Sequence, residues 1–100
     1  MYNLANTYNW LNRLDEAVRL YEDALDIRKR VLQSNHPKIG NTMYNLALTY
    51  NHLGRFQDAL TQMEEALAVY KRAYPPGHSE IKDAEKWVAK YRFYVTDSIR

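Results

Sequence analysis

The sequence predicts an all-α protein built from tandem helix-turn-helix hairpins, and three observations support this fold class. A block near the start recurs 42 positions later. Within each copy the apolar residues return at helical spacing. Three glycines and three prolines in 100 residues leave long stretches without a break, as long helices require. We therefore expect five helices in about two and a half repeats, stacked as an α-solenoid.

The internal repeat is the strongest of these signals. Met1–Ala5 returns as Met43–Ala47, and 18 of the 42 aligned positions are identical without a gap. The duplication predicts a single domain over residues 1–100. Its expected parts are repeat one at 1–36, repeat two at 37–77, a C-terminal capping helix at 78–96 and a short tail at 97–100.

Each copy is expected to contain two helices separated by a tight turn. The turn is predicted at Asn12–Arg13 in the first copy and at Gly54–Arg55 in the second, since glycine is common just past a helix end. The second helix of each copy opens with acidic and closes with basic residues, which complements the helix dipole. Pro37 suits the first turn of the third helix, and Pro75-Pro76-Gly77 is expected to stop the fourth.

The second helix of the first copy carries its own apolar stripe. This stripe comprises Ala17, Leu20, Tyr21, Ala24, Leu25 and Ile27. The last helix is expected from about Ser79 to about Val95, with one apolar face and charged residues elsewhere, as in a terminal capping helix. That face comprises Ile81, Ala84, Val88, Tyr91 and Val95.

These residues resemble the tetratricopeptide repeat family. A large residue, Asn-Leu-Ala, Tyr, Arg after a turn, Ala and Ala-Leu occur in the same order in both copies. The 42-residue period and the His-Pro-x-Ile opening at 36–39 resemble the subclass found in kinesin light chains, whereas the usual unit has about 34 residues. The resemblance spans about residues 1–95. It implies a scaffold that binds a protein or peptide partner and is not an enzyme.

In this family the first helices of successive hairpins line a concave groove, so the resemblance places a peptide-binding groove on those helices. By helical phase the groove residues are Tyr2, Asn3, Asn6, Asn9, Trp10, Asn41, Tyr44, Asn45, Leu48, Asn51, His52, Lys86, Trp87 and Lys90. Asp83 and Tyr94 lie on the same side of the last helix. The asparagines can donate and accept hydrogen bonds to an extended peptide backbone, or they can join neighbouring helices instead.

A self-association surface is the second hypothesis. Two and a half repeats leave an N-terminal helix edge uncovered, and the chain begins within a helix pattern, as a piece of a longer array would. The last helix also carries aromatic residues on more than one face, which is typical of interfaces. We expect a homodimer or higher oligomer that uses Met1, Leu4, Tyr8, Trp87, Tyr91, Phe93 and Tyr94, by end-to-end stacking or by exchange of the terminal helix.

Composition argues against other classes of function. The chain has no cysteine, and its three histidines have no ligand-spaced partner, so we expect neither a metal nor another cofactor. No nucleophile–base pair or phosphate loop is present, and no apolar run is long enough to span a membrane. With a net charge of +2 and few cations in the groove, nucleic-acid binding is a disfavoured third hypothesis. A cytoplasmic location is expected.

Overall fold

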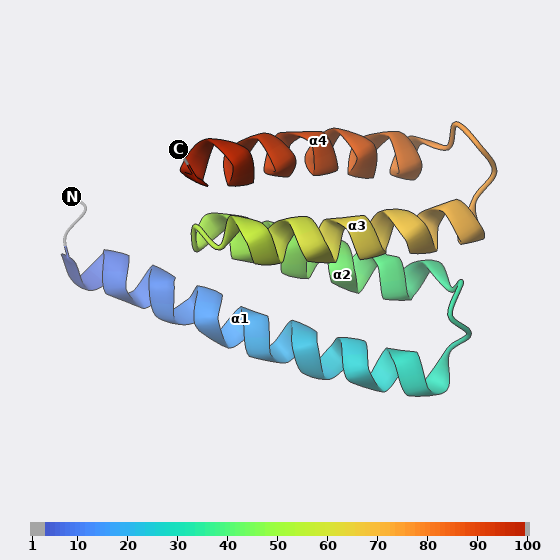
Figure 1. The fold of residues 1–100 in the computed structure, drawn as a ribbon. Helices are drawn as coiled ribbons and strands as arrows, with labels where there is room; N and C mark the ends of the chain where they lie inside the picture. Colours follow the sequence, from blue (N-terminus) through green and yellow to red (C-terminus); the bar gives the residue numbers. More distant parts are fainter. Residues whose placement is uncertain (1–3, 100) are drawn as a thin grey trace.

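The computed structural model describes the backbone of residues 4–99 and the side chains of residues 12–97, and this part of the chain is all-α, as predicted (Figure 1). It contains the helices α1 (Leu4–Val31), α2 (Pro37–His52), α3 (Phe56–Ala73) and α4 (Ser79–Ile99). α2 and α3 form an antiparallel hairpin, α1 packs against α2, and α4 packs against α3.

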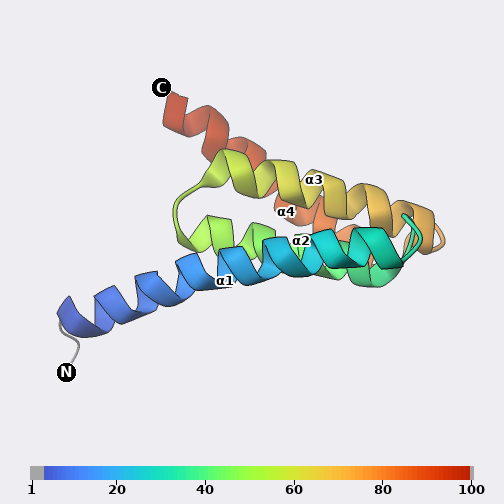
Figure 2. The same cartoon turned by 90° about the horizontal axis from the view of Figure 1, so that it is seen from below.

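The prediction of five helices is wrong, because one continuous helix replaces the first expected hairpin. α1 runs straight through Asn12 and Arg13, where the turn was expected, and its N-terminal part extends beyond the end of α2 (Figure 2). The corresponding turn in the second copy uses Gly54, whose φ of 77° lies in the left-handed region that a Cβ disfavours. Asparagine adopts this conformation less readily than glycine does, and at Asn12 the helix continues.

The predicted start and stop signals of the later helices are confirmed. Pro37 is the first residue of α2, and the His36 side chain accepts a hydrogen bond from the backbone N–H of Lys38 at 3.2 Å. α3 ends just before the two prolines, where Gly77 adopts a φ of 83°. α4 runs on to Ile99, past the expected end of the capping helix at residue 96 and into the expected tail.

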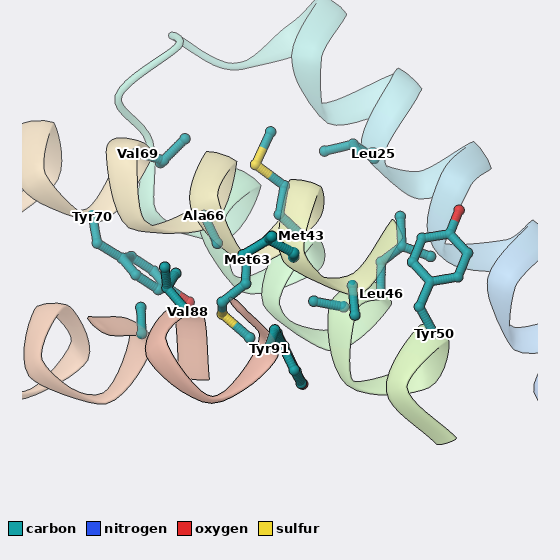
Figure 3. Packing of buried hydrophobic residues seen from close by; sticks show 14 of the residues in the cluster. Leu25, Met43, Leu46, Tyr50, Met63, Ala66, Val69, Tyr70, Val88 and Tyr91 are labelled. Carbon is teal, nitrogen blue, oxygen red and sulfur yellow. The ribbon is translucent and has the colours of Figure 1, made fainter. Parts of the chain in front are cut away.

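The hydrophobic core lies mainly between α2, α3 and α4 (Figure 3). Its largest fully buried side chains are Tyr70, Tyr91, Ile39, Leu46 and Met63. Alanines at 47, 59, 66 and 84 are 0% exposed, and such small residues allow neighbouring helices to approach closely. Of the α1 side chains that the structure describes, those of Val18 and Leu25 are buried in this core.

Candidate protein-binding face

The predicted groove residues of the second copy and the last helix lie on one side of α2 and α4. We call this surface the α2–α4 face, and it comprises Asn41, Tyr44, Asn45, Leu48, Asn51 and His52 of α2 with Asp83, Lys86, Trp87 and Lys90 of α4. The first-copy residues Tyr2, Asn3, Asn6, Asn9 and Trp10 lie outside the described side chains. Because α1 is straight, the backbone of residues 4–11 continues away from this face rather than lying beside α2 (Figure 2).

A small hydrogen-bonded cluster joins the two helices of this face. The Tyr44 hydroxyl donates to Oδ2 of Asp83, and Nε1 of Trp87 donates to the Tyr44 hydroxyl at 2.8 Å. Burial, reinforced by the hydrogen bond to the Asp83 carboxylate, raises the pKa of Tyr44 to about 12. The phenol therefore stays protonated at neutral pH, and both aromatic rings are held in fixed, half-buried positions.

Two lysines give the α4 side of the face a local positive charge. Nζ of Lys90 lies 5.1 Å from the centroid of the Trp87 ring, within cation–π range. Lys86 is exposed one turn before it. Together with Asp83 they place charges of both signs around the Trp87 ring.

The asparagines were predicted either to join neighbouring helices or to be available to a peptide, and they differ in their surroundings. Oδ1 of Asn41 accepts a hydrogen bond from the Tyr70 hydroxyl at 2.8 Å and so ties α2 to α3. Asn45 is exposed, and its side chain makes no hydrogen bond within the described part of the chain. Asn51 is half-buried. Asn41 thus joins α2 to α3, while the side chain of Asn45 is exposed.

The aromatic residues expected on a self-association surface are not equally accessible. Phe93 is 66% exposed, and Trp87 and Tyr94 are half-buried. Tyr91 is 0% exposed inside the core, so the prediction that it lies on the self-association surface is wrong. Its position on the same helical face as Ile81 and Val88 was the sequence signal for burial. Met1, Leu4 and Tyr8 lie outside the described side chains.

Sequence reasoning missed one surface altogether. Leu20, Ile27 and Val31 of α1 are 67%, 58% and 74% exposed. Leu20 and Ile27 belong to the apolar stripe predicted for the second helix of the first copy, and the hairpin expected there is replaced by the continuous helix α1. The signal that could have found it is the difference between Asn12 and Gly54 at equivalent turn positions.

Two of the three histidines accept hydrogen bonds from the backbone. His36 and His78 lie in equivalent inter-repeat loops, and each Nδ1 accepts a hydrogen bond from the backbone N–H two residues later. Among the residues that the structure describes, no group of three or more histidine, aspartate or glutamate side chains could hold a metal ion. No helix in that part of the chain is long and apolar enough to cross a membrane.

Comparison with known proteins agrees with this architecture. A family model for the tetratricopeptide repeat matches residues 1–72. A search of curated proteins finds no match.

Proposed function

Because this chain belongs to the tetratricopeptide repeat family, we propose that it is a scaffold without catalytic activity that binds a peptide segment of a partner protein along the α2–α4 face. Repeats of this family generally mediate protein–protein interaction. The 42-residue period supports a kinesin-light-chain-like subclass within this proposal. The cytoplasmic location and the lack of nucleic-acid binding stay predictions.

The observation that carries the proposal is the Tyr44–Trp87 pair. The hydrogen bond between them holds two aromatic rings half-buried at the junction of α2 and α4. Rigid aromatic residues provide contact area at a low cost in conformational entropy, and tryptophan and tyrosine are enriched among residues that dominate binding. Beside them, the exposed amide of Asn45 can donate to and accept from a peptide backbone.

The test is selection of peptides from a random display library on the intact chain, followed by calorimetric titration of the selected peptides. Replacing Trp87 or Asn45 by Ala is expected to weaken binding, by about tenfold or more for Trp87. Gln57→Ala is the matched control, since Gln57 is an exposed amide on α3. Circular dichroism checks that each variant remains folded.

Failure to select any peptide would contradict the proposal. So would selected peptides that bind the Trp87 and Asn45 variants as tightly as the unchanged chain.

Self-association is a second candidate function, and a separate observation favours it. Large apolar side chains are exposed at Leu20, Ile27 and Val31 on α1 and at Phe93 on α4. Leu20, Ile27 and Val31 share one side of α1 by helical phase, and exposed apolar patches of this kind mark interaction sites. Sedimentation velocity at increasing protein concentration tests this function, and a constant monomeric mass would contradict it.

A further inference from the structure

One side of α1 carries a row of apolar residues that the described part of the chain leaves largely uncovered. We call it the exposed α1 stripe, and it comprises Leu20, Ala24, Ile27 and Val31. Leu20, Ile27 and Val31 are exposed, and Ala24 is half-buried beside them. At 3.6 residues per turn these four residues fall within a sector of about 60° around the helix axis. They therefore form one continuous apolar strip.

Contacts on another side of α1 fix the direction in which this stripe points. Val18 and Leu25 are buried in the core, and Nη1 of Arg28 donates to Oγ1 of Thr42 at 2.8 Å. The middle of the stripe lies about 140° around the helix from Val18 and Leu25, so it faces away from the core. α1 is the first helix of the stack, and seen from below it lies in front of the others (Figure 2). The stripe is thus accessible to another molecule.

The spacing of the stripe is that of a seam between two paired helices. Its members follow one another at steps of four, three and four residues, as the a and d positions of a coiled coil do. The second copy shows a helix at the equivalent place. Ala24 and Ile27 correspond to Ala66 and Val69, which are buried in the core of the α2–α3 hairpin. We therefore expect the occupant of the stripe to be a helix.

Charged residues beside the stripe indicate which helix this is. Glu16, Asp23 and Arg30 follow one another at intervals of seven residues, so they form one row along the outer edge of the stripe, and all three are exposed. Asp23 forms no ion pair within the described part of the chain. Arg30 pairs with Asp26 but keeps 73% of its side chain exposed. A row with an acid at 23 and a base at 30 is complementary to the same row running in the opposite direction.

We propose that the exposed α1 stripe binds a second copy of the chain, with the two α1 helices antiparallel about a two-fold axis. Leu20 packs on Val31 of the partner subunit and Ala24 packs on Ile27 of the partner subunit, which gives four apolar layers. On the outer edge each Asp23 meets Arg30 of the partner subunit. This inference rests on self-association, the second proposed function, and specifies its surface and orientation.

The side chains at the ends of the stripe favour this register over the neighbouring one. Sliding the helices by one heptad, so that Ala24 faces Leu20 of the partner subunit, would bring the two Asp23 carboxylates together. It would also place Arg13 opposite Val31 within the apolar seam. Like charges side by side and an unpaired charge among apolar residues both oppose pairing. The proposed register avoids both.

The size of the contact predicts a weak dimer. α1 ends at Val31, so the seam stops after four layers. Contacts at the low end of interface size form transient complexes. The dimer is therefore expected at high protein concentration and dissociates on dilution, where Val31 is exposed as in the monomer.

The decisive experiment exchanges the charges of the outer row. Asp23→Arg and Arg30→Asp each turn two attractive pairs per dimer into repulsive ones, and each is expected to weaken the dimer by roughly tenfold. The double variant Asp23→Arg/Arg30→Asp is expected to restore it. The two residues stand about 10 Å apart along one helix, so only a contact between chains can produce this restoration. Sedimentation velocity over concentrations up to the solubility limit measures the association, and circular dichroism checks folding.

A second pair of variants tests the stripe itself. Ile27→Glu places a charge in the middle of the seam and is expected to abolish the dimer. Phe93→Glu is the matched control, since Phe93 is an exposed large apolar residue on α4, outside the proposed contact. It is expected to leave the dimer intact.

The outcomes separate this pairing from self-association in general. A dimer that survives Ile27→Glu but is lost in Phe93→Glu would overturn the pairing while self-association stands. A parallel pair would bring Asp23 beside Arg28 and leave Arg30 without an acidic neighbour, so an Arg30→Asp chain that associates normally would overturn the antiparallel arrangement. Failure of the double variant to restore the dimer would exclude the proposed register. An unchanged chain that is monomeric at every concentration would overturn both the pairing and self-association.

Discussion

The ring of Tyr70 on α3 lies directly against Gly40 on α2, so that a Cβ built on Gly40 would stand 2.7 Å from Cε1 of the ring. Tyr70 is 1% exposed, and its hydroxyl donates to Asn41. Two adjacent residues of α2, Gly40 and Asn41, therefore contact the Tyr70 side chain. This contact sets how closely the two helices of the second hairpin approach.

Gly40→Ala is expected to destabilise the protein. A methyl group gains about 1 kcal/mol of helix propensity. Overpacking against a ring that cannot move costs about 1–3 kcal/mol, and the cost should exceed the gain. Urea unfolding measures the difference, and Tyr70→Val in the same chain should relieve the overpacking term in a double-mutant cycle. A more stable Gly40→Ala protein would show that the ring has room to shift.

Gly54→Ala is expected to weaken the second hairpin. The φ of 77° at this position costs a residue with a Cβ about 1–2 kcal/mol, and no atom within 4 Å would otherwise obstruct the added methyl group. Gly54→Asn should cost less, because asparagine tolerates this conformation better than alanine does. Thermal unfolding of the two variants provides the comparison. Equal losses would argue against backbone strain as the cause.

The core and the exposed end of α1 offer a matched comparison of two valines. Val69 is 2% exposed and Val31 is 74% exposed. Val69→Ala removes two buried methyl groups and should cost about 2 kcal/mol, whereas Val31→Ala should change stability by less than about 0.5 kcal/mol. Chemical denaturation of both variants at the same protein concentration checks this ordering. A similar loss at Val31 would mean that this residue is covered in solution.

Tyr44 is expected to make stability fall at alkaline pH. Its pKa is raised from 10.0 to about 12 by burial and by the Asp83 carboxylate, so between these values the unfolded chain loses a proton that the native state keeps. The stabilisation is complete below pH 10 and is lost as the pH rises towards 12. Each such group contributes at most about 1.4 kcal/mol per pH unit to the slope.

Tyr44→Phe is the variant that isolates this contribution. It should lower stability at neutral pH by about 1 kcal/mol, because Nε1 of Trp87 loses its acceptor, and it should make the alkaline fall shallower. Burial also raises the pKa values of Tyr70 and Tyr91, so part of the fall should remain in the variant. Denaturant unfolding at a series of pH values measures both effects. An unchanged alkaline slope would contradict the role of Tyr44.

Part of the α2–α4 face could be predicted from the sequence. Helical phase placed Tyr44 and Trp87 on the same side of the array, because each helix turns by a fixed angle per residue. Their hydrogen bond joins residues 43 positions apart and depends on how α3 spaces α2 from α4. Asn41 and Asn45 share this side of α2, yet only Asn41 meets a buried tyrosine. The helical periodicity of the sequence does not distinguish Asn41 from Asn45 in this respect.

The sequence by itself determined the repeat, the helical periodicity and the turn at Gly54. These features follow from residue spacing and from the conformational freedom of a single glycine, both of which are local. Only the tertiary structure decided that Asn12 remains helical and that Ala17 stays half-buried while the equivalent Ala59 is fully covered. Burial depends on which helix lies alongside. An apolar stripe does not specify whether the covering helix belongs to the same hairpin, to a later repeat or to another chain.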